Sequence, residues 1–129
     1  MSIPAGPPIH GEFSSADASG LNEANSRILL YGQLATTALT LNANDTVIVS
    51  HLAISSAGTN LTVSIYDGAD ATVDAGEVIW RGVVPTNTTI DAWLLVPHYC
   101  QKGTWPKVKA SGAGQVYVTL HGSATRVGA

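Results

Sequence analysis

Several kinds of residue are scarce in this chain, and each scarcity excludes a class of protein. Cysteine occurs once, as Cys100, among 129 residues, which excludes an intramolecular disulfide framework. Asp, Glu, Lys and Arg make up only 12% of the chain, about half of the usual fraction of about 25%. No apolar run approaches the roughly 20 residues that a membrane-spanning helix needs, so no membrane partner is expected.

Basic residues are also too few to form a nucleic-acid surface. Six Lys and Arg stand against nine Asp and Glu, giving a formal net charge of −3. Only Lys102, Lys107 and Lys109 lie near one another in the sequence, and a phosphate-binding surface needs a larger cluster. Nucleic acid is therefore not an expected partner. The first residues lack the basic and apolar segments of a signal peptide, so export by the usual route is not expected either.

Residues 1–25 differ in composition from the rest of the chain. Pro4, Pro7 and Pro8 fix φ and withhold backbone donors, which favours an extended and solvated chain. We expect an extended N-terminal arm over residues 1–25 and one folded domain over residues 26–129, with the arm dispensable for folding. The alternative is a leader without a role. The residues expected to make the arm's contacts are Ile3, Pro4, Pro7, Pro8, Ile9 and Phe13.

From residue 26 onward, short apolar runs alternate with turn residues. Eight runs have the length and composition of strands: 27–31, 33–41, 46–56, 61–66, 77–84, 90–96, 107–110 and 115–121. Strands at this nearly regular spacing are typical of an all-β sandwich or barrel. The segments 47–49 and 93–96 are apolar at consecutive positions, although a sandwich strand should alternate. We expect an outer sheet face to be buried in an oligomer; the alternative is that these segments lie where something else covers one face of a sheet.

The sequence offers little that indicates catalysis. No serine lies in a Gly-x-Ser-x-Gly motif, and the four histidines are isolated in sequence. His98 and Cys100 are close, but we expect their side chains to point in different directions, which predicts a plain free thiol at a strand end. The protein is therefore not expected to be an enzyme, and no cofactor or metal ligand is expected.

Two loops have the composition of binding sites. The acidic loop 67–77 is the best cation candidate, but its spacing does not match an EF-hand, and a solvated loop is the favoured interpretation. Trp105 lies in the loop 101–106 and is the best candidate for an exposed contact with a carbohydrate or a protein. The alternative is that Trp105 fills the core, as strand tryptophans usually do.

Part of the chain resembles small β-sandwich proteins of tailed bacteriophages. In residues 51–68, a strand, a Ser-Ala-Gly turn and a strand ending in Tyr-Asp-Gly precede a small acidic loop; residues 77–80 and the closing strand 114–120 follow the same pattern. Such proteins include capsid decoration (cement) proteins and head-fibre domains. The resemblance implies an antiparallel, jelly-roll-like β-sandwich that forms homotrimers and extends a terminal arm over neighbouring capsid subunits.

The expected function is therefore structural. The protein would bind the major capsid protein on the outer surface of a phage head and stabilise the shell by joining neighbouring subunits. Its place would be the virion surface, after a period in the host cytoplasm during assembly. The alternative is a carbohydrate- or receptor-binding β-sandwich module that uses exposed aromatic residues such as Trp105.

Overall fold

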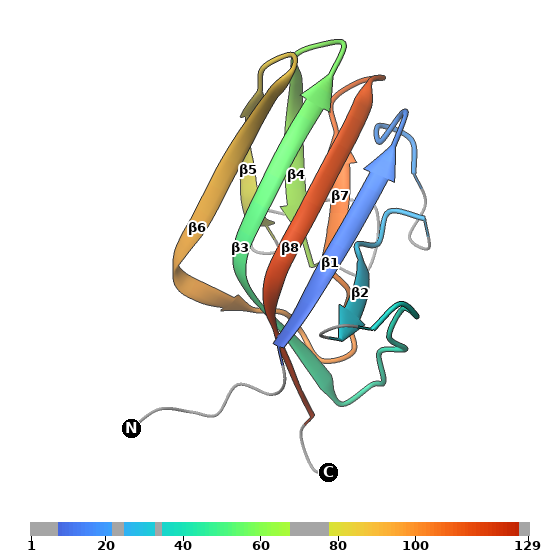
Figure 1. The fold of residues 1–129 in the computed structure, drawn as a ribbon, viewed down its shortest axis with the longest axis vertical. Coiled ribbons are helices and arrows are strands. Elements are labelled where there is room, and N and C mark those ends of the chain that lie inside the picture. The colour runs from blue at the N-terminus through green and yellow to red at the C-terminus, as the bar shows by residue number, and fades with distance from the viewer. Residues whose placement is uncertain (1–7, 22–24, 33–34, 68–77, 127–129) are drawn as a thin grey trace.

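The computed structural model describes residues 8–21, 25–32, 35–67 and 78–126, and its regular structure is entirely β (Figure 1). The eight strands are β1 (Pro8–Ser15), β2 (Leu29–Gly32), β3 (Asp45–Ala57), β4 (Leu61–Tyr66), β5 (Val78–Val84), β6 (Thr88–Tyr99), β7 (Lys107–Ala110) and β8 (Gln115–Arg126). The prediction of an antiparallel β-sandwich of about eight strands is confirmed.

The strands form two sheets that lie face to face (Figure 1). The larger has the order β2-β1-β8-β3-β6 and the smaller the order β5-β4-β7. The chain just before β2 also joins β7, because Ile28 N donates to Pro106 O over 2.9 Å and Val108 N donates to Ser26 O over 2.9 Å. Counting that segment with the smaller sheet gives the orders 1-8-3-6 and 5-4-7-2, the arrangement of a jelly roll.

The core lies between the sheets and follows the alternation of the strands. In β4 the side chains of Leu61, Val63 and Ile65 are buried on one face, as the sequence predicts. In β8 the buried Val116, Val118 and Leu120 alternate with exposed residues, because successive strand residues point to opposite sides.

The arm predicted over residues 1–25 is wrong for Pro8–Ser15. These residues form β1, which pairs with β2 on one side and with β8 on the other. Ile9 and Phe13 are 5% and 7% exposed and belong to the core. Pro8 is therefore the first residue of a sandwich strand, and residues 8–15 do not belong to a free arm. Residues 1–7 lie outside the described residues.

Apart from shifts of up to three residues at strand ends, the other strand predictions differ from the structure at two places. The predicted strand 33–41 does not form over its described part, residues 35–41; residues 35–40 are exposed, and β-propensity alone does not make a strand without a face to bury. The predicted polar tail 122–129 is wrong for residues 122–126, which continue β8 because Asp45–Val49 of β3 pairs with them.

A β-bulge at Ser50 shapes the larger sheet. Val49 lies opposite Gly122 and His51 opposite His121, so β3 advances two residues where β8 advances one. On the other side of β3, Val49 lies opposite His98 and His51 opposite Trp93, which leaves residues 94–97 of β6 facing Ser50 alone. The extra residues bend β6 outward at this point.

Candidate functional site

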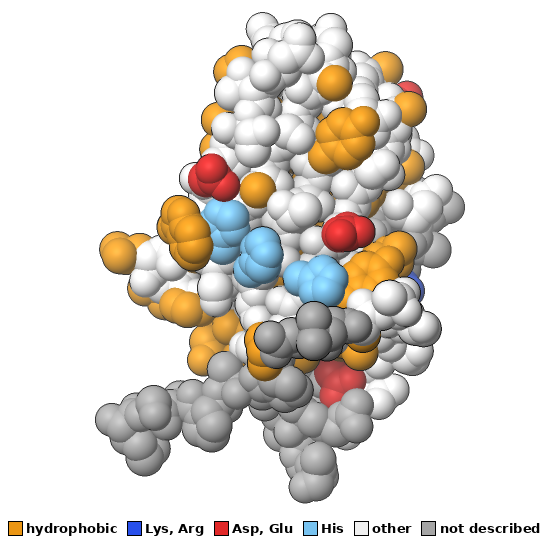
Figure 2. Space-filling view, viewed as in Figure 1, with side chains coloured by type: hydrophobic (Ala, Val, Ile, Leu, Met, Phe, Trp, Pro, Cys, Tyr) orange, Lys and Arg blue, Asp and Glu red, His pale blue; other side chains and the backbone are white. Residues whose placement is uncertain are grey.

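A row of five rings crosses the outer face of the larger sheet, one from each strand. His10 of β1 lies opposite both Tyr31 of β2 and His121 of β8, and His51 of β3 lies opposite both His121 and Trp93 of β6. Residues directly opposite in an antiparallel sheet project from the same face. Figure 2 views this face and shows the histidine side chains side by side across it.

His51 is the most strongly connected member of this row. Its Nε2 lies 3.2 Å from Asp91 Oδ1, and its Nδ1 lies 3.4 Å from His121 Nδ1. A carboxylate can only accept, so a neutral His51 donates Nε2–H to Asp91 and accepts at Nδ1 from His121. The ring of Trp93 packs over His51 with 4.1 Å between ring centroids. The contacts hold Trp93 in place while leaving it 77% exposed.

Strand β6 carries an exposed apolar surface that begins at Trp93, the last ring of this row. We call it the apolar strip; its members are Trp93, Leu95, Val96 and Tyr99. Leu95 is 99% exposed and Val96 77% exposed, and both belong to the segment that bulges away from β3. Because β6 is the last strand of its sheet, the strip lies along an edge whose outer backbone groups have no strand partner within the described residues. Unprotected apolar edges of this kind are sites of association.

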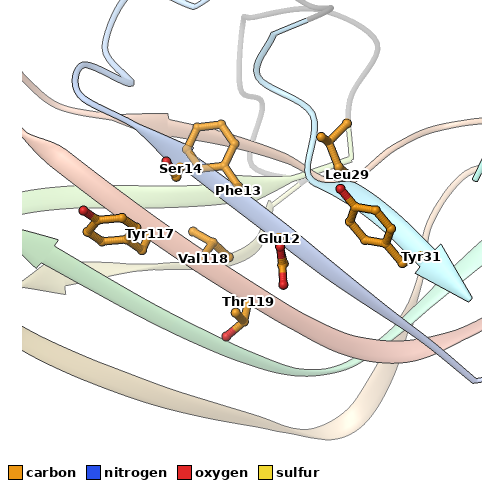
Figure 3. A pocket seen from close by; sticks show the side chains of 8 residues that line it. All are labelled: Glu12, Phe13, Ser14, Leu29, Tyr31, Tyr117, Val118 and Thr119. Carbon is orange, nitrogen blue, oxygen red and sulfur yellow. The ribbon is translucent and has the colours of Figure 1, made fainter. Parts of the chain in front are cut away.

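An open groove of about 420 Å³ lies over β1, β2 and β8. It is on the same outer face, toward the sheet edge opposite β6. Figure 3 shows Glu12 and Thr119 between the rings of Tyr31 and Tyr117. Tyr117 is half-exposed. The groove therefore combines two aromatic surfaces with a carboxylate and a hydroxyl group.

A buried cluster of Asp67, His98 and Cys100 lies at one end of the sandwich. His98 Nε2 is 2.8 Å from Asp67 Oδ2, and one potential ligand atom from each of the three residues lies within 4.8 Å of the others. Burial, more than any other cause, raises the pKa of the Cys100 thiol far above its ordinary value; the Asp67 carboxylate raises it further, and Lys107 acts in the opposite direction. The thiol is therefore held in its protonated form.

Comparisons of this chain with known protein families, curated proteins and solved structures found no match. The described part of the chain contains no helix that could cross a membrane.

Several residues predicted to make surface contacts are buried or partly buried in the structure. Ile9 and Phe13 are core residues and are not available to bind a capsid, whereas Pro8 is exposed. Ile3, Pro4 and Pro7 lie outside the described residues. Trp105 is partly buried against the core, and the Arg27 guanidinium carbon lies 4.2 Å from its ring centroid, so its ring is not the free platform that the loop composition suggests.

The expectation that His98 and Cys100 point in different directions is wrong. Residues two apart in a strand project to the same side, and the structure brings both toward Asp67, the first residue of the predicted acidic loop. The rest of that loop, residues 68–77, lies outside the described residues. The histidine row was also missed, because the cross-strand register that aligns its members cannot be obtained from isolated histidines.

Proposed function

We propose that this protein is a structural virion protein, a capsid decoration (cement) protein that binds the outside of a phage head and joins neighbouring subunits of the major capsid protein. The observation that carries the proposal is the apolar strip of β6. The resemblance to small phage β-sandwich proteins and the jelly-roll topology, which viral capsid domains also use, support it at the level of the fold.

The occupant that we assign to the apolar strip is a second copy of this chain, within a homotrimer. Among the residues of β6, Thr88–Tyr99, there is no Glu, Lys or Arg, and Asp91 is the single Asp. Two copies that meet at this edge therefore have little charge to desolvate. Aromatic residues such as Trp93 and Tyr99 bury roughly 150–250 Å² each. A stable interface buries about 800 Å² of surface on each partner. The strip alone is smaller than this, so it supplies the centre of the interface and the rest of β6 supplies the rim.

Assembly into a trimer suits a protein that stabilises a shell. Each copy contacts the capsid lattice, and once one contact forms the others become intramolecular, so weak individual contacts add to strong attachment. The low charge of the chain, 12% of its residues, reduces the cost of removing water from these contacts, since charged groups are the most costly to desolvate.

Leu95→Asp is expected to convert the trimer into monomers and to weaken attachment to purified phage shells by at least about 100-fold, because it places a charge at the centre of an apolar interface. The side chain is almost fully exposed in the single chain, so folding is unaffected. Sedimentation velocity measures the mass, and co-sedimentation with undecorated shells measures attachment. Thr89→Asp, at an exposed position of the same strand, is the matched control. A wild-type protein that stays monomeric and remains in the supernatant when the shells are sedimented would contradict the proposal.

The groove over β1, β2 and β8 favours a second candidate function, carbohydrate binding. Tyrosine rings stack on sugar faces, while Glu12 and Thr119 supply hydrogen-bonding groups between them. If this function holds, a glycan array shows specific binding that Tyr117→Ala reduces at least about tenfold, with Trp105→Ala as the comparison. An array without specific signals removes this candidate.

A further inference from the structure

We propose that Asp67, His98 and Cys100 form a binding site for a divalent transition metal ion of the Zn²⁺ class. The residues come from both sheets: Asp67 directly follows β4 of the smaller sheet, whereas His98 belongs to β6 of the larger sheet and Cys100 directly follows it. A bound ion would therefore tie the two layers together at one end of the sandwich.

The donor set selects the class of metal. A thiolate sulfur, an imidazole nitrogen and a carboxylate oxygen together suit Zn²⁺ and similar borderline ions, whereas Ca²⁺ and Mg²⁺ prefer oxygen alone. Three protein ligands leave a fourth position for water, an arrangement that Zn²⁺ sites commonly have.

The geometry of the cluster is close to what such an ion requires. Zn²⁺ binds oxygen and nitrogen at about 2.0–2.2 Å and sulfur at about 2.3 Å, which places tetrahedral ligands roughly 3.3–3.7 Å apart. The ligand atoms here lie within 4.8 Å of one another, with 2.8 Å between Asp67 Oδ2 and His98 Nε2. To reach those separations the 2.8 Å pair must open by about 0.5 Å, and a pair at the 4.8 Å limit must close by roughly 1.1–1.5 Å.

Two of the three ligand residues are buried, and the third reaches solvent. The Asp67 side chain is 5% exposed and Cys100 is 4% exposed, so two acidic groups face each other away from water. On binding, the Cys100 S–H bond breaks and its proton leaves to water as a sulfur–metal bond forms. His98 Nε2, which donates to Asp67 Oδ2 without the ion, gives its proton to water and bonds the metal, while Nδ1 takes a proton from water, so the imidazole stays neutral. Lys107 contributes a positive charge near the thiol, which favours the thiolate and partly opposes the ion. His98 is 28% exposed and provides the route from solvent.

Co²⁺ is the probe that tests this site, because a cobalt–thiolate bond gives a charge-transfer absorption that nitrogen and oxygen ligands do not. Full-length protein treated with a chelator and then titrated with Co²⁺ is expected to develop this band with one equivalent, and Zn²⁺ is expected to remove it. Cys100→Ser abolishes the band. His98→Gln keeps the thiol but weakens binding by at least about 100-fold, because outer-shell changes alone cost about 10–100-fold.

His51 and His121 provide the matched control. Their Nδ1 atoms face each other over 3.4 Å, so this pair is a second place where a transition metal ion could bind. The double variant His51→Gln/His121→Gln is expected to leave the charge-transfer band unchanged. Zn²⁺ is expected to raise the melting temperature of the wild type but not of His98→Gln, which provides a second measurement should Cys100→Ser fold poorly. Absence of Co²⁺ binding overturns the proposal. The proposal is also overturned if Co²⁺ binds without giving the charge-transfer band and the double variant abolishes that binding.

Discussion

A protein lacking residues 1–25 is expected to lose its cooperative fold. The deletion removes β1, which pairs with β8 over eight residue positions and with β2 over four. It also removes the buried side chains of Ile9 and Phe13, whose burial contributes together about 3–6 kcal/mol. Each lost backbone hydrogen bond adds about 1 kcal/mol. A domain of this size is usually stable by about 5–15 kcal/mol, so little stability remains.

A thermal melt followed by circular dichroism measures this effect, and the matched control is a deletion of residues 1–7. That shorter deletion leaves every described strand intact and is expected to melt cooperatively within a few degrees of the full chain. A cooperative melt of the longer deletion near the wild-type temperature would contradict the role of β1. The shorter deletion is also the variant with which an N-terminal contribution to shell attachment is measured without loss of the sandwich.

Local sequence patterns predicted the strands whose signals are local. The bounds predicted for β4 and β7 agree with the structure, because turn residues or a proline flank each of these short segments. In β1 the buried positions are Ile9, Gly11 and Phe13, which also alternate, but the central glycine supplies no apolar signal. An added Cβ at Gly11 would lie 2.7 Å from Ile28 Cγ2, so the packing itself explains why the strand was hidden.

The histidine row was harder to predict from the sequence, because it depends on the register between strands β3 and β8. His51 and His121 are 70 positions apart, and their alignment follows from the extra residue at Ser50, which no local pattern reveals. The two segments with consecutive apolar residues also have different outcomes. Residues 47–49 are buried within the chain itself, whereas Trp93, Leu95 and Val96 remain exposed. Only the second segment fits the expectation of a face available to an oligomer.

Gly122→Ala is expected to be strongly destabilising, because it affects the bulge that sets this register. An added Cβ would overlap the carbonyl oxygen of Ile48 and lie 3.0 Å from its carbonyl carbon and 3.3 Å from Val49 Cα. These are backbone atoms in the middle of the larger sheet, so no side-chain rotation relieves the contact. We expect a loss of about 3 kcal/mol in the free energy of unfolding, which corresponds to a melting temperature lower by roughly 10 °C.

Gly20→Ala is the matched control, because an added Cβ there meets no atom within 4 Å, and its effect is expected to stay within about 0.5 kcal/mol. Chemical denaturation measures both variants, and equal stabilities would show that the close approach of Gly122 to β3 does not matter. The folded fraction of Gly122→Ala carries a second expectation. Since β3 must move to admit the methyl group, the contact between His51 and His121 opens, and the imidazole NMR signals of both residues shift, whereas they stay in place in Gly20→Ala.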